Sequence, residues 1–160
     1  WRWQVFLVLV WILIAGGAAT ASLVKKPDNP IPKEVVIDGQ NVLITETNPF
    51  TRLEAGKISK YLLTWQQHKY RLLVLKEESG RYKAALDACA ICGWEKGYSQ
   101  LKNGDLVCNV CGTTLPLNSL GQGGGCNPVP LKVSKQMQSG LVIKLKEIEK
   151  AAKNVKGNLN

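Results

Sequence analysis

The chain has 160 residues, of which 45% are hydrophobic, and its 21 basic and 12 acidic side chains give a net charge of +9. This length suggests one domain with accessory segments. The charge does not indicate nucleic-acid binding, because the cysteine-rich region 89–126 is neutral and the excess lies on residues 132–156, with seven lysines and two glutamates. A solvated lysine-rich face explains this excess most simply, and attraction to anionic lipid headgroups is the alternative.

Residues 1–24 have the features of a single-pass membrane anchor. The stretch 3–24 has no charged residue, and as a helix its 22 residues would span about 33 Å, enough to cross the hydrocarbon core of a bilayer. Its tryptophans and its abrupt end at Lys25 and Lys26 favour such a segment. The alternative is a signal peptide cleaved after the small residues 19–21. We favour an uncleaved transmembrane helix.

The flanking charges bear on the topology of this anchor. Only Arg2 precedes it, whereas two lysines follow it. Because positive residues gather on the cytoplasmic side, this count alone would place the following domain in the cytoplasm. Residues that precede Trp1 in a longer chain would change the count, so the charges do not decide the orientation.

Residues 34–160 are predicted to form a β-rich domain, joined to the anchor by a proline-rich linker at residues 25–33. Its apolar and β-branched runs are short and are bounded by turn residues, as in antiparallel sheets. The fold class is therefore β-rich α+β, in which an N-terminal transmembrane helix precedes a small antiparallel β domain. The predicted elements are a hairpin at 34–45 with its turn at Asp38-Gly39, strands at 57–65, 70–75, 81–86 and 141–145, and a short C-terminal helix at 146–155.

Five cysteines between residues 89 and 126 are spaced to hold a metal. Four form two Cys-x-x-Cys-Gly pairs, Cys89 with Cys92 and Cys108 with Cys111, and the fifth, Cys126, follows three glycines. Each pair directs two thiolates at one point, and the fifteen residues between the pairs are typical of tetrathiolate sites. This spacing predicts a cysteine-knuckle metal module at residues 87–131. Thiolates suit zinc, iron and iron–sulfur clusters alike, so the spacing does not separate these cofactors.

The fifth cysteine and the disulfide alternative both bear on this prediction. A zinc ribbon is complete with four ligands, whereas Cys126 on its flexible loop could reach a cluster, replace one ligand or be a spare thiol.

Structural disulfides are disfavoured, because the odd count leaves one thiol unpaired and Cys-x-x-Cys makes a strained bridge. A thiol–disulfide exchange site would need the motif to open a helix, and residues 93–97 do not predict one.

Other polar and aromatic residues near the cysteines have simpler interpretations. His68, the only histidine, is predicted to be a polar surface residue and not a ligand. Trp94 and Tyr98 are interpreted as hydrophobic cover, with shielding of a cluster from water as the alternative. Asp87 and Asp105 are expected to shape turns. No nucleophile–base pair that would support hydrolysis occurs, which favours a non-catalytic redox or metal-binding subunit and leaves other enzyme activity open.

The cysteine motifs also resemble those of a known family. The motifs 87–93, 96–98, 107–112 and 124–131, the last with Gly-Gly-Cys-Asn-Pro, look like the bacterial and archaeal iron–sulfur-containing, membrane-associated domain family. The likeness covers about residues 70–131, and all five cysteines match the cysteines of the family. Members are found with ferrous-iron uptake systems or membrane permeases. The resemblance therefore implies an anchored, extracytoplasmic metal centre that serves iron handling or electron transfer.

Together these observations predict a membrane protein with a metal centre on its soluble domain. The expected cofactor is iron or an iron–sulfur cluster, and the alternative is zinc in a ribbon-like interaction module without redox chemistry. The expected partners are the membrane bilayer and other membrane-protein subunits, with no nucleic acid. The expected metal ligands are Cys89, Cys92, Cys108, Cys111 and Cys126.

Overall fold

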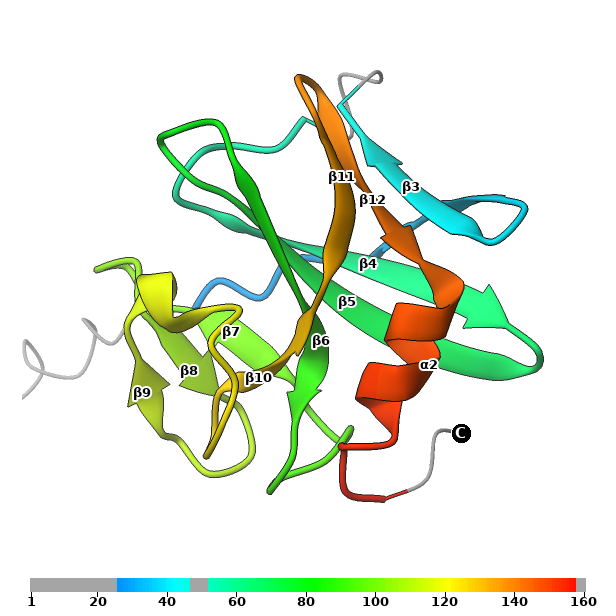
Figure 1. Cartoon of the computed structure of the whole chain (residues 1–160). Coiled ribbons are helices and arrows are strands. Elements are labelled where there is room, and N and C mark those ends of the chain that lie inside the picture. The colour runs from blue at the N-terminus through cyan, green and yellow to red at the C-terminus, as the bar shows by residue number, and fades with distance from the viewer. Residues whose placement is uncertain (1–25, 47–51, 158–160) are drawn as a thin grey trace, which may run out of the picture.

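The structure is a computed structural model that describes residues 26–46 and 52–157 (Figure 1). At its centre lies a five-stranded sheet in the order β1-β4-β5-β6-β10. Its neighbouring strands are antiparallel except for β1 and β4, which pair in parallel. The strands are β1 (Lys33–Glu34), β4 (Ile58–Trp65), β5 (His68–Lys76), β6 (Tyr82–Cys89) and β10 (Pro128–Leu131).

The β4–β5 hairpin is the longest ladder of this sheet, and its register is set by a two-residue turn. Trp65 lies opposite His68, so Gln66 and Gln67 alone make the turn. Both glutamines have positive φ, 47° and 67°, as a type I′ hairpin turn requires. The predicted strands at 57–65 and 70–75 are confirmed as β4 and β5, and the turn between them is shorter than predicted.

A second sheet has the order β11-β12-β3-β2. The predicted hairpin at 34–45 is confirmed, but Asp38 pairs with Asn41, so its turn is Gly39-Gln40, one residue later than predicted. The predicted strand at 141–145 is also confirmed, and it leads directly into the helix α2. These elements are β2 (Val36–Asp38), β3 (Asn41–Thr45), β11 (Val133–Met137), β12 (Gly140–Lys144) and α2 (Leu145–Ala152).

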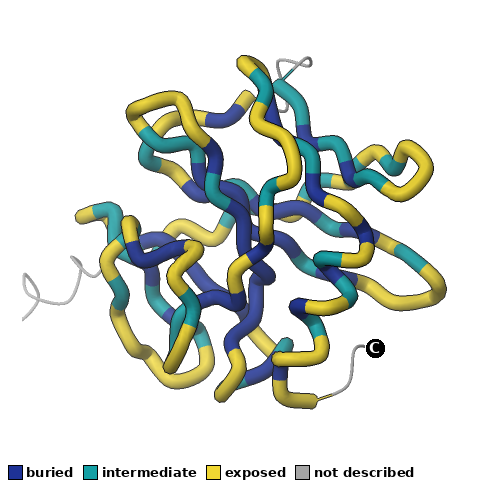
Figure 2. Tube along the Cα trace, in the orientation of Figure 1, coloured by how far each residue is buried: buried dark blue, intermediate teal, exposed yellow. Residues whose placement is uncertain are grey.

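One face of the central sheet packs against the second sheet and α2, and this contact is the main hydrophobic core. Side chains that alternate along β4 and β5 point into it, together with one face of α2. Figure 2 shows the buried segments gathered where the sheets meet. Helix α2 begins at Leu145 and ends at Ala152, so it is shorter than the predicted 146–155. Core residues include Val42, Ile44, Tyr61, Leu63, Tyr70, Leu72, Leu141, Ile143, Leu145 and Ile148.

The opposite face of the central sheet is covered by the cysteine module. This region adds a three-stranded sheet in the order β7-β8-β9 and a short 3-10 helix, Leu117–Ser119. Its strands are β7 (Tyr98–Gln100), β8 (Leu106–Cys108) and β9 (Thr114–Leu115). A second hydrophobic cluster joins the module to the sheet, and it contains Ile58, Leu73, Leu75, Ala85, Cys89, Tyr98, Leu106, Cys108 and Leu120.

The predicted anchor, residues 1–24, lies outside the described residues. Between residues 26 and 157, as far as the structure describes them, no helix has the length and apolar character needed to cross a membrane. The segment predicted as a linker contacts the domain. Asp28 and Gln100 exchange backbone hydrogen bonds of 2.8 Å, and β1 pairs with β4. The chain is therefore in contact with both the cysteine module and the central sheet before β2 begins.

Candidate metal centre

The two Cys-x-x-Cys motifs form the same backbone turn on different strands. Cys89 ends β6, and the N–H of Gly93 donates to its carbonyl oxygen at 3.0 Å. Cys108 ends β8, and the N–H of Gly112 donates to its carbonyl oxygen at 2.9 Å. Both glycines have a φ of 74°, a conformation that other residues rarely adopt. This turn directs the two thiols of each motif to the same side of the chain.

All five thiols gather at one place. The sulfur atoms of Cys89, Cys92 and Cys126 lie within 4.8 Å of one another, and so do those of Cys92, Cys108 and Cys111. Cys92 belongs to both groups and joins them. A further contact of 3.5 Å connects the sulfurs of Cys111 and Cys126. The structure therefore brings together every cysteine that the sequence singled out, and all five are free thiols.

The spacing of these sulfurs suits a metal ion. Zinc–sulfur bonds of about 2.3 Å place the thiolates of a tetrahedral site about 3.8 Å apart. Separations of up to 4.8 Å within each group are close to that value, so small movements bring four sulfurs onto one ion. The donors are soft thiolates, which favour zinc, iron and iron–sulfur clusters over hard cations.

Cys126 reaches the cluster because β10 pairs with β6. Pro128, two residues after Cys126, lies opposite Cys89 in this ladder. The hydroxyl of Tyr98 donates a hydrogen bond to the carbonyl oxygen of Cys126 and holds the loop from the side of the module. Tyr98 itself lies opposite Cys108 in the β7–β8 ladder. One tyrosine thus connects the fifth cysteine to the strand that carries the second knuckle.

The cluster lies at the boundary between the domain interior and solvent. Cys89 and Cys108 are only 1% and 2% exposed. Cys92 and Cys126 are half-buried, and Cys111 is exposed. The strand ends therefore hold the inner thiols rigidly, while the outer thiols meet water and any approaching molecule.

Hydrogen bonds lower the pKa of Cys111, the exposed thiol of the cluster. The hydroxyl and the backbone N–H of Thr113 hydrogen bond to the sulfur of Cys111 and lower its pKa to about 6. Burial raises the pKa of Cys92, and the neighbouring thiols raise it further. Because the thiolate is the form that binds metals, Cys111 is the cysteine best prepared for ligation near neutral pH.

A buried ion pair lies beneath the module. Lys60 on β4 and Asp87 on β6 are 4% and 2% exposed, and their Nζ and Oδ2 atoms are 2.8 Å apart. The other carboxylate oxygen, Oδ1, accepts the N–H of Tyr98 at 2.7 Å. A Cβ on Gly97 would lie 2.3 Å from this oxygen, so the chain approaches the carboxylate too closely for a side chain. Asp87 fixes the loop between the first knuckle and β7.

This ion pair is the main feature that the sequence did not reveal. Asp87 was expected to shape a turn, but it lies within β6 and accepts the N–H of Tyr98, eleven residues along the chain. Lys60 stands in an otherwise mostly apolar strand, which is the one signal that pointed to a buried lysine. Nothing in the sequence pairs it with a residue 27 positions away. Strand pairing across β5 brings the two together.

Of the other residues considered from the sequence, His68 and Trp94 lie beside Tyr70, and Tyr98 lies against the inner thiols. His68 is exposed at the start of β5, and its ring meets the edge of the Tyr70 ring at 6.3 Å, outside both thiol groups. Trp94 packs against the main core beside Tyr70. Tyr98 is fully buried in the second hydrophobic cluster with Cys89 and Cys108. Of the two aromatic residues, Tyr98 is the one that directly covers the inner thiols.

The fold and the site define a small β-rich domain whose cysteine cluster could hold a metal. The model of the family described as "Membrane iron-sulfur containing protein FtrD-like" matches residues 53–155, and the chain belongs to this family. The match runs from before β4 to beyond α2, so it includes the central sheet as well as the cysteines. The predicted resemblance is confirmed. Comparisons with curated proteins and with solved structures find no match.

Proposed function

We propose that the chain is a thiolate-ligated iron protein that serves electron transfer or iron handling for a membrane complex. The observation that carries this proposal is the convergence of all five thiols, with Cys92 shared by two groups. Soft sulfur ligands at these separations favour iron or zinc. The family description, which names an iron–sulfur membrane protein, favours iron.

Four thiols from the two knuckles are the simplest ligand set, namely Cys89, Cys92, Cys108 and Cys111. They come from two turns of the same geometry, and such paired turns hold tetrathiolate sites in other proteins. Cys126 lies beside this set and is a fifth ligand or an exchangeable one. Bound iron would supply a one-electron centre whose potential depends on hydrogen bonds to sulfur and on exposure.

The protein residues prepare the site for this chemistry. The backbone N–H of Cys92 donates to the sulfur of Cys89 at 3.0 Å, and Thr113 forms a hydrogen bond with the sulfur of Cys111. Such donors stabilise negative charge on the thiolates and raise the reduction potential of a bound iron centre. The buried side of the site excludes water. The exposed side, at Cys111, leaves a short path for an electron or an ion.

A structural zinc site is the second candidate, and the small sulfur separations favour it. An ion bound by four thiolates needs them close together, whereas a cluster of several irons spreads its ligands over different metal atoms. A zinc centre would hold the two knuckles together without electron transfer. The domain would then act as an interaction module on a larger membrane assembly.

The membrane part of the proposal rests on the family description and on the sequence. We propose that residues 1–24 anchor the chain by a single pass and that the cysteine domain lies outside the cytoplasm. Support comes from the 22 uncharged residues at positions 3–24 and from the membrane assignment of the family. Labelling of an introduced exposed cysteine with a membrane-impermeant reagent, in a chain without the native thiols, tests the orientation.

Element analysis of the purified full chain tests the proposed cofactor most directly. Iron in stoichiometric amount, with visible thiolate-to-iron absorption that bleaches on reduction, is the expected result. Colourless protein with one zinc per chain would favour the zinc module instead. Protein that carries no metal and has labile Cys-x-x-Cys disulfides would contradict both metal functions and indicate thiol–disulfide exchange.

A further inference from the structure

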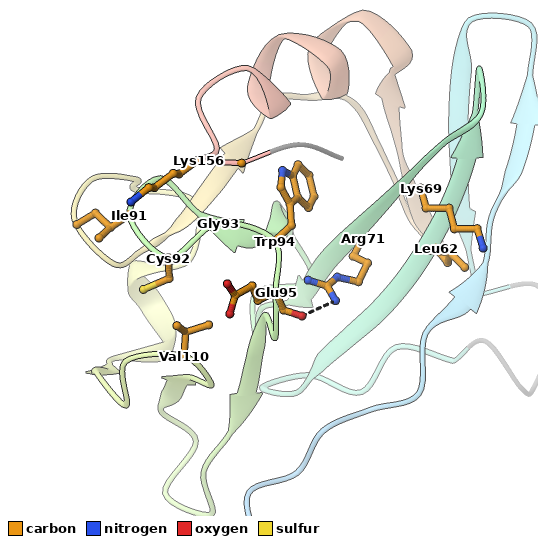
Figure 3. A pocket seen from close by; sticks show the side chains of 11 residues that line it. Leu62, Lys69, Arg71, Ile91, Cys92, Gly93, Trp94, Glu95, Val110 and Lys156 are labelled. Atoms are coloured by element: carbon orange, nitrogen blue, oxygen red, sulfur yellow. Dashed lines mark hydrogen bonds between the residues drawn. The ribbon is translucent and has the colours of Figure 1, made fainter. Parts of the chain in front are cut away.

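A groove beside the thiol cluster lies between the two knuckles and the central sheet. Its volume is about 730 Å³, and Cys92 lines it together with residues of β4, β5 and the chain after α2. Figure 3 shows Ile91 and Val110 on the knuckle side of this groove and Lys69 and Arg71 on the sheet side. Any molecule that fills the groove therefore touches the knuckle that carries Cys92.

The knuckle wall is apolar and exposed. Ile91 and Val110 occupy equivalent positions, each directly before the second cysteine of its motif, and they are 58% and 40% exposed. They are two of the four large hydrophobic side chains that are exposed within residues 26–46 and 52–157. Single exposed apolar residues are ordinary, but two that flank a candidate metal centre form a small patch suited to contact with another protein.

The opposite wall is positively charged. Lys69 and Arg71 lie on this wall, and Figure 3 shows Lys156 beside Ile91 on the knuckle side. The only carboxylate among the lining residues is that of Glu95. Lys69 and Arg71 are two positions apart on β5, so both side chains point to the same face of the sheet, the one that carries the cysteine module. Three cations against one anion favour a negatively charged occupant.

The guanidinium group of Arg71 has a donor without a hydrogen-bond partner among the described residues. Its Nη1 donates to the backbone oxygen of Glu95 at 3.4 Å, which is a long bond. Its Nη2 is buried, and no acceptor for it occurs in the part of the chain that the structure describes. A buried donor without a partner is costly, and a guanidinium binds a carboxylate through two parallel hydrogen bonds. The missing acceptor is therefore supplied most simply by a carboxylate that enters the groove.

We propose that this groove is the docking site of a partner protein that presents carboxylates around an apolar side chain. The apolar side chain would contact Ile91 and Val110, and a carboxylate would pair with Arg71 and Lys69. The concave shape and Glu95 favour a protein surface over a flat anionic bilayer. The nature of the partner, an electron or iron carrier, rests on the proposed function, whereas the docking itself does not.

The test follows the methyl resonances of Ile91 and Val110 by NMR in the full chain, held in lipid nanodiscs and loaded with diamagnetic zinc, so that resonances beside the centre stay sharp. The probe is a short capped peptide in which glutamates flank a leucine, and its matched control has lysines in place of the glutamates. We expect the acidic peptide to shift both methyl groups and the lysine peptide to leave them unchanged. High ionic strength should weaken the binding of the acidic peptide by about fivefold or more.

Charge-reversal variants test the assignment of the groove. Lys69→Glu, an exposed position, and Arg71→Glu should each weaken binding by about fivefold or more. Lys135→Glu is the matched control, because Lys135 is exposed on β11 of the second sheet and should leave binding unchanged. Equal binding of both peptides, an equal loss in all three variants, or larger methyl shifts with anionic lipids than with the peptide would overturn the proposal. Because zinc occupies the thiols in this test, none of these outcomes depends on which metal the chain carries in the cell.

Discussion

The two faces of the central sheet are built on different principles. The face toward the second sheet and α2 buries hydrocarbon side chains such as Leu63 and Leu72. The face toward the cysteine module buries two thiols, an ion pair and fewer large apolar side chains. Apolar burial is favourable by itself, whereas buried thiolates and charges are favourable only with their partners present. We infer that the first face folds without metal and that the second depends on it.

The largest effect is expected from Cys92→Ser. Cys92 belongs to both thiol groups, so its loss should abolish metal binding, which contributes on the order of 10 kcal/mol in thiolate sites of this kind. Residues 87–131 should then become open to protease and hydrogen exchange, while the core between the two sheets stays protected. Ala90→Ser, in the same knuckle but exposed, is the control that should keep both the metal and the protection.

Equal loss of protection on both faces in Cys92→Ser would show that the two faces fold as one unit. A metal-free Cys92→Ser protein with an intact module would show that the hydrophobic cluster around Tyr98 and Leu106 suffices to fold this region. Either result would contradict the difference between the faces that we infer.

A smaller effect is expected from Lys60→Met, which leaves the buried carboxylate of Asp87 without its cation. Removing one partner of a buried pair costs about 3 kcal/mol of unfolding free energy. Adding Asp87→Asn should restore much of this stability, because the amide oxygen still accepts the N–H of Tyr98. Urea unfolding of the single and double variants measures this coupling. Simple additivity of the two substitutions would show that the pair is not coupled.

Leu72→Ala tests the face of the central sheet that packs against the second sheet and α2. Leu72 is fully buried in the main core, and its truncation should cost about 3 kcal/mol of global stability. Because Leu72 points away from the cysteine module, the metal content per folded chain should not change. Loss of metal from the folded variant would mean that the two faces are coupled through the sheet.

The parts of the molecule that could be predicted are those with a local signal. Short apolar runs bounded by turn residues marked β4, β5 and β12, and the spacing of the cysteines marked both knuckles. Strands β7 and β9 were missed because they have only three and two residues and no room for a periodic pattern. Their packing depends on distant partners: Tyr98 of β7 is buried in the same cluster as Leu73 of β5 and Ala85 of β6.

The Lys60–Asp87 pair is a second contact that no local sequence pattern could predict, and it lies within the site. Each residue alone resembles a surface charge, and only the sheet topology makes them neighbours. In contrast, Cys126 was already a candidate ligand from its Gly-Gly-Cys-Asn-Pro motif, with a spare thiol as the alternative. Its actual approach depends on the pairing of β10 with β6, which no local pattern predicted.

Cys126→Ser is expected to weaken metal binding less than Cys92→Ser does. Cys126 belongs to one of the two thiol groups, and the four knuckle thiols are left intact by its loss. We expect metal to stay bound, with an affinity lower by about tenfold, as when a group that supports a metal ligand is removed. Competition with a chelator measures this difference. Complete loss of metal would make Cys126 an essential ligand and exclude the simple four-thiol set.

The smallest expected effect concerns Glu46, on the face of the molecule away from the thiols. Burial acts to raise the pKa of Glu46, but hydrogen bonds from Lys76 and Tyr82 and the charge of Lys76 outweigh it, so the pKa lies below its ordinary value. A lowered folded pKa stabilises the folded protein above the ordinary pKa of glutamate, and this stability is lost as the pH falls through the folded value.

Glu46→Gln should therefore cost about 1 kcal/mol at neutral pH, and the difference from the unsubstituted protein should shrink on acidification. Using the difference between the two proteins removes the contribution of thiol protonation and metal release, which both share. Thermal unfolding from neutral to acidic pH measures it. A difference that stays constant with pH would show that the carboxylate of Glu46 has the same pKa folded and unfolded, and that its bonds to Lys76 and Tyr82 add no pH-dependent stability.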